Sequence, residues 1–383
     1  MRLPLARWLG LTLLTVHAAA CAPPDRGAAG RGATLVVGTA RPAAVAWLDD
    51  GRGPHGAALA GAPEQLAAGP GGGVVALTAD AAGGGRVALE LVRPRGAAAP
   101  AVARRLSGLE TSGRARLAAD GRRYAVVSYQ RRPDRPEDRP PAGPAARTEA
   151  ARCPLLVVDL LSGASTPAPG PCRADETLRS LTLEAGGPDG EGLPAAFAYV
   201  GLAGARAGSE DGAGRLAMVA LPSGAVVGSR ALAGTPVDLR LGAGGRDAPA
   251  ALYVLEQAGG AGGVVPTPER GRVVVLNPLT LDVVGEHALS APASRLVPAP
   301  DGRSVFLVRD DTVWRLTLPT GTLRQLARLP GRIVAAEPLG ERLYLGSPEA
   351  GTLWVVDTRS GLRQPDLHLR LLGPPISLAV AGR

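Results

Sequence analysis

Short apolar runs separated by turn residues recur throughout the chain. Between residues 293 and 328 four such runs follow one another, and Asp301-Gly302, Asp310-Asp311 and Thr320-Gly321 separate them. Asp-Gly pairs readily adopt the positive φ that tight β-hairpin turns require. The pattern therefore predicts a meander of four antiparallel strands, named A to D in chain order below.

The same unit is repeated along the chain. Repeats of roughly 40 to 55 residues with four strands each are typical of β-propeller blades. Strand A is matched by seven segments, 63–69, 114–120, 178–184, 236–242, 293–299, 332–338 and 374–380. Strand B is matched by 74–80, 124–130, 195–201, 250–256, 304–310 and 342–348. Strand C is matched by 86–96, 155–163, 216–224, 273–280, 313–321 and 353–361.

The first strands of the repeat region lack a strand A. Residues 33–39, 43–51 and 53–61 match strands B, C and D, whereas 374–380 is a strand A that no further strand follows. We therefore expect these segments to share one closing blade. Closure would remove the free sheet edges that otherwise pair with other chains.

Two motifs carry a resemblance to a known family. Pro300-Asp301-Gly302 ends one strand A, and the segment 355–361, VVDTRSG, ends one strand C. Both resemble the repeats of bacterial YVTN-type and WD40-like propellers, and the resemblance covers residues 33–383. It implies an all-β fold, a seven-bladed β-propeller of four-stranded antiparallel blades. Because many unrelated functions use this fold, the resemblance implies no single activity.

Composition argues against a nucleic-acid partner. The formal net charge is +8, and a basic balance can indicate binding to nucleic acid. However, all 42 basic residues are Arg, and they are scattered among Asp and Glu. This bias fits a GC-rich genome better than selection for phosphate binding, so we expect no nucleic acid.

The N-terminus has the features of a secretory signal. Arg2 and Arg7 precede an apolar stretch over 8–16, and small residues lead to Cys21. The apolar part is too short to span a bilayer permanently. The sequence predicts a signal peptide over 1–20, a flexible tether over 21–32 and the propeller over 33–383.

The residues around Cys21 resemble a lipobox, in which the cysteine is lipidated and becomes the mature N-terminus. Ala18 replaces the usual Leu of that motif. The alternative is plain secretion after cleavage at 18–20, with an unmodified Cys21. Because residue 22 is Ala rather than Asp, the resemblance implies the outer membrane, facing the periplasm or the cell surface.

Cys153 and Cys172 are candidates for a disulfide. Cys153 opens a strand C and Cys172 ends the following strand D, and these two ends meet in an antiparallel pair. An extracytoplasmic compartment permits the bond. The alternative, a pair of metal-binding thiolates, has no further ligands nearby in the sequence.

Loop lengths indicate which side of the propeller binds. The A–B and C–D connections are mostly tight and share one face, whereas three B–C loops on the opposite face are long, at 131–152, 203–214 and 257–271. Long loops on a rigid scaffold commonly carry binding sites. Candidate partner-binding residues are Arg131, Arg132, Asp134, Arg135, Glu210, Asp211, Glu256 and Glu269. The alternative for 131–152 is an inert, solvated insertion.

Polar side chains on the A strands would line the central channel. The candidates are Arg114, Arg116, Arg179, Asp238, Arg240 and Arg295. These residues either bind an anion or pair with neighbouring acids. His55, His287 and His368 fall in D strands of three blades, where they should not converge, so we expect no catalytic residues, no metal and no cofactor.

The sequence therefore predicts a non-enzymatic cell-envelope lipoprotein whose propeller face binds a protein partner, in a scaffolding or assembly role. The partner itself is not identified by any motif, and the domain is expected to be monomeric. Two alternatives stay open: a propeller enzyme such as a lactonase-like hydrolase, and a binder of small anionic ligands in the Arg-lined channel.

Overall fold

The computed structural model describes residues 33–40, 42–48, 55–79, 86–95, 98–110, 115–128, 153–173, 176–184, 197–204, 214–242, 250–257, 271–366 and 374–382. The predicted signal peptide, the tether and Cys21 lie outside these ranges. Within them, no helix has the length and hydropathy that crossing a membrane requires.

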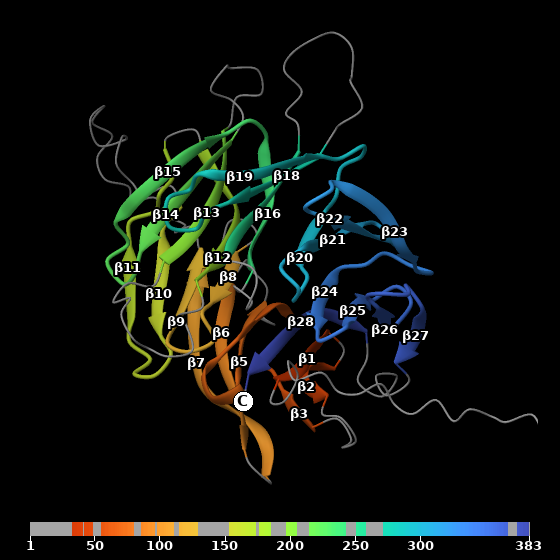
Figure 1. Ribbon diagram of the computed structural model, residues 1–383. Coiled ribbons are helices and arrows are strands. Elements are labelled where there is room, and N and C mark those ends of the chain that lie inside the picture. The colour runs from red at the N-terminus through yellow and green to blue at the C-terminus, as the bar shows by residue number, and fades with distance from the viewer. Residues whose placement is uncertain are drawn as a thin grey trace, which may run out of the picture.

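The described strands form seven four-stranded antiparallel sheets, which are the blades of a propeller (Figure 1). The innermost strands are β4 (Pro63–Ala68), β8 (Arg116–Ala119), β12 (Glu176–Leu183), β16 (Thr235–Gly242), β20 (Arg295–Pro298), β24 (Ala335–Leu339) and β28 (Pro375–Gly382). The second strands are β1 (Ala33–Ala40), β5 (Val74–Ala79), β9 (Tyr124–Ser128), β13 (Phe197–Gly204), β17 (Ala251–Gln257), β21 (Ser304–Arg309) and β25 (Arg342–Ser347).

The outer half of each blade completes the sheet. The third strands are β2 (Ala43–Leu48), β6 (Arg86–Arg95), β10 (Leu155–Asp159), β14 (Gly214–Ala220), β18 (Gly271–Leu276), β22 (Thr312–Thr317) and β26 (Thr352–Asp357). The outermost strands are β3 (His55–Ala58), β7 (Ala98–Glu110), β11 (Ser165–Ala168), β15 (Val226–Leu232), β19 (Val283–Ala288), β23 (Thr322–Arg328) and β27 (Arg363–Asp366). Blades 1 to 6 start at β4, β8, β12, β16, β20 and β24.

The closing blade joins the two ends of the propeller. Its strand order is β28-β1-β2-β3, and β28 pairs antiparallel with β1, with Ala33 opposite Gly382. The innermost strand β28 also contacts β4 on one side and β24 on the other. Figure 1 shows blue β28 beside the red-orange β1. The predicted shared closing blade is therefore confirmed, as is the seven-bladed fold.

Hydrophobic clusters between neighbouring blades hold the ring together. Among the described residues there are seven, one for each pair of adjacent blades. In β21, Val305 and Leu307 pack toward blade 4, whereas Phe306 and Val308 pack toward blade 6. Because successive side chains of a strand point to opposite faces, a strand buried on both sides needs an unbroken apolar run.

Alternating strand directions give the ring two different faces. On one side lie the connections from the first to the second strand and from the third to the outermost strand of each blade; we call this side the turn face. On the other side lie the connections from the second to the third strand and from one blade to the next; we call it the loop face. On the turn face Gly121, Gly302 and Gly361 have φ of 75°, 63° and 77°, as the glycine turns of the sequence predict. In the turn between the third and outermost strands of blade 4, Leu281 takes the place that Gly361 has in blade 6. Its φ is 61°, and its side chain is buried.

Candidate functional site

The loop face carries three long connections in neighbouring blades. They join β9 to β10 in blade 2, β13 to β14 in blade 3, and β17 to β18 in blade 4. The predicted bounds of the second and third were slightly too wide, because residues 203, 204, 214, 257 and 271 belong to strands. In each of these three blades, one strong interaction holds the start of the third strand in place. We call this interaction the clamp of the blade. It is a disulfide in blade 2 and an ion pair in blades 3 and 4.

The clamp of blade 2 is a disulfide. Cys153 lies two residues before the start of β10 and is bonded to Cys172, which follows β11, with 5.7 Å between their Cα atoms. The backbone is closely packed here, since a Cβ on Gly170 would lie 1.9 Å from the Cys153 carbonyl oxygen. The bond therefore fixes the end of the longest loop to the adjacent connection on the same face.

The clamp of blade 3 is a buried ion pair. Arg215 is the second residue of β14, and its Nε donates to Glu176 Oε1 at 2.8 Å. A second guanidinium nitrogen bonds the other carboxylate oxygen and the carbonyl of Pro171. The side chains of Arg215 and Glu176 are only 11% and 8% exposed. Since Pro171 adjoins Cys172, the clamps of blades 2 and 3 are in direct contact.

The clamp of blade 4 repeats this arrangement. Arg272 is the second residue of β18 and donates to Glu256 at 2.7 Å and to Glu286 at 3.0 Å. Glu256 also accepts the backbone N–H of Gly234 from blade 3 at 2.9 Å. The prediction that Glu256 lies in a partner-binding loop was wrong. It lies in β17, where its side chain is buried and is ion-paired with Arg272.

The two ionic clamps differ in electrostatics. Burial by itself would raise the pKa of Glu176, but the hydrogen bonds from Arg215 and Arg173 and their positive charges outweigh burial and lower it. In Glu256 burial dominates and raises the pKa, although Arg272 and the Gly234 N–H oppose it. The Oε1 atom of Glu256 has no hydrogen-bond partner among the described residues. The blade 3 clamp is therefore the better satisfied of the two.

Glu176, Arg215 and Arg272 were not among the predicted site residues, although the sequence carries a signal for the two ionic clamps. Gly-Arg occurs at the start of the third strand at 214–215 and again at 271–272. The other predicted partner-binding residues, Arg131, Arg132, Asp134, Arg135, Glu210, Asp211 and Glu269, lie outside the described residues.

The central channel holds a compact ionic cluster. Arg240 on β16 donates to Glu337 on β24 at 3.2 Å, and its Nε lies 3.9 Å from Asp238. Asp238 also accepts the backbone N–H of Leu296 on β20 at 2.9 Å. The cluster therefore connects the innermost strands of blades 4, 5 and 6.

Burial shapes the charges of this cluster. It lowers the pKa of Arg295, and the positive charges of Arg240 and Arg116 act in the same direction. It raises the pKa of Glu337, with Arg240 and Arg295 opposing. Arg240 is thus ion-paired with Glu337 and Asp238, whereas Arg295 feels their charges without an ion pair to either in the described structure.

Of the other channel candidates, Arg116 on β8 acts on this cluster through its positive charge. Arg179 is exposed on β12 and makes no hydrogen bond or ion pair with the cluster in the described structure, and Arg114 lies outside the described residues. Glu337 was missed, although it stands in a predicted strand A. Gln65 on β4 accepts the Leu117 N–H at 2.7 Å, as Asp238 does for Leu296. Polar side chains here satisfy backbone groups at the inner sheet edges.

The aromatic and histidine side chains are distributed over several blades. Trp47, Trp314 and Trp354 lie on third strands and pack against hydrophobic clusters between blades. His55 and His287 lie on outermost strands of different blades, and His368 is outside the described residues. Within the described ranges no group of three or more His, Cys, Asp or Glu side chains is placed to hold a metal ion.

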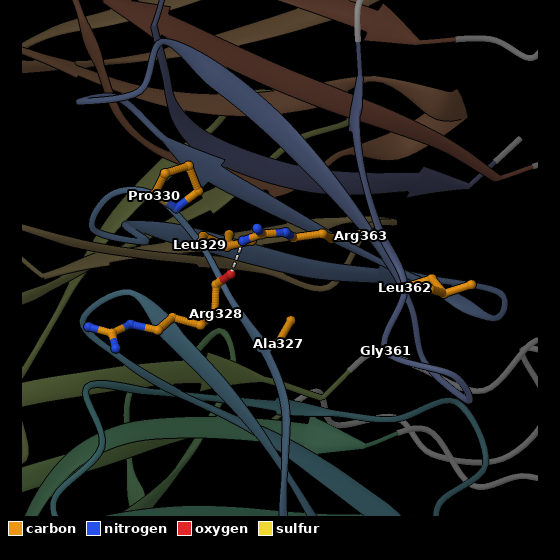
Figure 2. Close-up of a pocket in the computed structure, with 7 residues that line it drawn as sticks. All are labelled: Ala327, Arg328, Leu329, Pro330, Gly361, Leu362 and Arg363. Carbon is orange, nitrogen blue, oxygen red and sulfur yellow. Dashed lines mark hydrogen bonds between the residues drawn. The ribbon is translucent and has the colours of Figure 1, made fainter.

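A shallow groove lies at the rim between blades 5 and 6 (Figure 2). Its volume is about 520 Å³. Figure 2 shows the Arg363 guanidinium directed at the carbonyl of Arg328, to which it is hydrogen-bonded. Arg328 is paired with Asp311 at 2.8 Å, and Arg363 also lies over the ring of Trp354. Both cations of the groove are thus engaged within the protein.

Comparison with known proteins supports the fold. No family model matches the chain, and no curated protein matches it. Among solved structures, AztD from Citrobacter koseri in its apo form is similar at 15% identity and a TM-score of 0.52, covering 92% of this chain and 98% of AztD.

Two further structures are similar over nearly their whole length. A functionally unknown protein from Desulfotomaculum acetoxidans has 13% identity and a TM-score of 0.58, covering 91% of this chain and 99% of its own. A candidate 6-phosphogluconolactonase from Bacteroides fragilis has 13% identity and a TM-score of 0.56, covering 94% and 99%. Likeness at this level of identity shows the propeller fold alone.

Proposed function

We propose that this protein is a non-enzymatic lipoprotein of the cell envelope whose loop face binds a protein partner. The observation that carries the proposal is the set of three clamps beneath three neighbouring long connections. Each clamp fixes the point where a long connection re-enters its blade.

The energetics of the clamps support a positioning role. Two buried ion pairs are weak evidence for a gain in stability, because desolvating the charges offsets much of their attraction. Apolar residues of similar size would serve the core at least as well. Fixing the end of a loop does favour binding, because a loop with a fixed end loses less conformational entropy when it binds a partner.

The channel gives less support to the alternative functions. An anion binder needs guanidinium groups without nearby carboxylates, whereas Asp238 and Glu337 offset Arg240 and Arg295. A hydrolase needs a positioned nucleophile and base within hydrogen-bond reach of each other. The contacts of Asp238, Arg240 and Glu337 instead join the innermost strands of blades 4, 5 and 6.

The proposal is tested by shortening the three connections. Residues 131–150, 206–212 and 259–269 would each be replaced by a short Gly-Ser linker that leaves the clamps intact. We expect the partner captured from envelope extracts to be lost, and its affinity after purification to fall by at least about tenfold, the scale of losing one interface hot spot.

The matched control shortens residues 185–196, a connection of similar length on the turn face. This variant should keep the partner. Retention of full affinity by the triple loop variant, or an equal loss in the control, would contradict the proposal.

A further inference from the structure

Exposed apolar side chains gather on the turn face. All seven large hydrophobic side chains that are exposed in the described structure lie in the turn after a third strand or among the first two residues of an outermost strand. They are Leu161, Val226, Val227, Leu279, Val283, Val284 and Leu362. Val284 is 69% exposed and Leu161 is 63% exposed.

Six of these residues form one belt across blades 2, 3 and 4. We call Leu161, Val226, Val227, Leu279, Val283 and Val284 the apolar belt. The turn of each blade packs on the outermost strand of the blade before it. Gly224 lies against Ala168, and Arg230 donates to the carbonyl of Leu281 at 3.0 Å. The belt residues therefore lie on three consecutive blades whose turns and outermost strands are packed together.

The polypeptide enters the propeller on this same face. β1 begins at Ala33, which is opposite Gly382 at the end of innermost strand β28, and innermost strands end on the turn face. Only eleven residues, 22–32, lie between Cys21 and Ala33. Such a segment reaches at most about 40 Å when extended and spans about 20 Å as a random coil.

We propose that the turn face lies against a lipid membrane and that the apolar belt inserts its side chains into the headgroup region. The inference rests on the lipid anchor at Cys21, which belongs to the proposed function. A short tether on the turn face brings that face to the bilayer, and contiguous exposed apolar side chains are what an interfacial membrane contact requires. The loop face then points away from the membrane, toward a partner.

The test uses the full lipid-modified protein in vesicles of phosphatidylethanolamine and phosphatidylglycerol. An environment-sensitive label is attached at Val284→Cys in one variant and at Ser290→Cys in the other. Both positions are exposed: Val284 lies near the turn-face end of β19, and Ser290 lies just beyond its loop-face end. Nitroxide-bearing lipids should quench the label at position 284 strongly and leave the label at 290 almost unquenched.

A second variant separates the belt from the tether. Replacing Leu161, Val227 and Leu279 by Ser should reduce quenching at 284 to the level at 290, while the melting temperature stays unchanged because these side chains are exposed. Equal quenching at both positions, or unchanged quenching in the serine variant, would overturn the inference.

The anchor itself is checked separately by mass spectrometry of the mature N-terminus. A lipid on Cys21 with equal quenching at both positions refutes only the orientation. Absence of the lipid refutes the anchor, and the inference with it.

Discussion

The two faces of the propeller are held together by different kinds of interaction. On the turn face, a single side chain closes several of the short connections locally: Asp357 Oδ1 accepts the N–H groups of Arg359 and Ser360 at 3.1 and 2.7 Å. On the loop face, the clamps join residues far apart in sequence, such as Arg215 and Glu176, which are 39 residues apart.

The difference lies in what each interaction fixes. An Asx-type turn sets the conformation of its own hairpin and costs little when it is lost. A clamp fixes one strand relative to another and leaves a buried charge unpaired when one partner is removed. Removing clamps should therefore cost more than removing turn caps.

The largest expected effect comes from opening the ring, because both faces exist only while it is closed. Deleting residues 374–383 removes β28, which pairs with β1 and contacts β4 and β24. We expect loss of the cooperative thermal transition and aggregation, measured by circular dichroism and sedimentation. Replacing residues 22–32 by Gly-Ser is the control. A truncated protein that melts like the parent would contradict the closed ring.

Breaking the blade 3 clamp should have the next largest effect. Arg215→Ala leaves Glu176 buried without its cation, which typically costs about 3 to 5 kcal/mol. Urea denaturation measures the change in the free energy of unfolding. Arg303→Ala, an exposed position on the turn face, should change stability by less than about 0.5 kcal/mol. Equal effects of the two variants would remove the distinction between clamps and turns.

The pH dependence sharpens the same comparison. The pKa of Glu176 is lowered in the folded protein, so its ionised form contributes stability that is complete above the unfolded value of about 4.3. That contribution is lost as pH falls through the folded pKa. Arg215→Ala should flatten the stability profile in this acidic range. An unchanged slope would show that Arg215 does not set this pKa.

The disulfide should contribute somewhat less than the ionic clamp. It joins residues 19 apart, and closing a loop of that size stabilises by about 3 kcal/mol through the unfolded chain. Replacing both Cys153 and Cys172 by Ala should lower the unfolding free energy by this amount. Added reductant should bring the parent to the same value, and a parent that reductant does not affect would argue against the bond.

The smallest effect is expected at a turn cap. The backbone N–H and the hydroxyl of Ser360 lower the pKa of Asp357. Asp357→Ala should cost about 1 kcal/mol, the usual value of a hydrogen bond. Asp357→Asn should restore most of it, because Asn277 closes the corresponding turn of blade 4 in the same way. A loss as large as that of Arg215→Ala would contradict the comparison.

The sequence predicted the blades because their information is local. The apolar run within 304–309 indicates a strand buried on both faces, and Asp301-Gly302 indicates a turn with positive φ. Such local patterns were enough to predict the strands, the turns and the closure of the ring. The candidate site was harder, since its contacts are distant. Arg240 and Glu337 are 97 residues apart, and their pairing depends on where three innermost strands sit in the channel.

Glu256 illustrates the same limit. It lies next to a predicted long loop, and the alternation of the strand does not reveal that Arg272 folds back onto it. The apolar belt was also missed, because the valines at 226–227 and 283–284 have the same local pattern as buried strand residues. These valines lie on outermost strands, and no further strand of the blade lies beside them to cover their side chains.

The central claim, that the partner binds the loop face, is tested most directly by photo-cross-linking in intact cells. A cross-linking amino acid would be placed at Ser290 on the loop face and, in a second strain, at Ser223 on the turn face, both exposed positions. The account predicts that Ser290 yields a discrete protein adduct and Ser223 yields none. A protein adduct from Ser223 alone would contradict it.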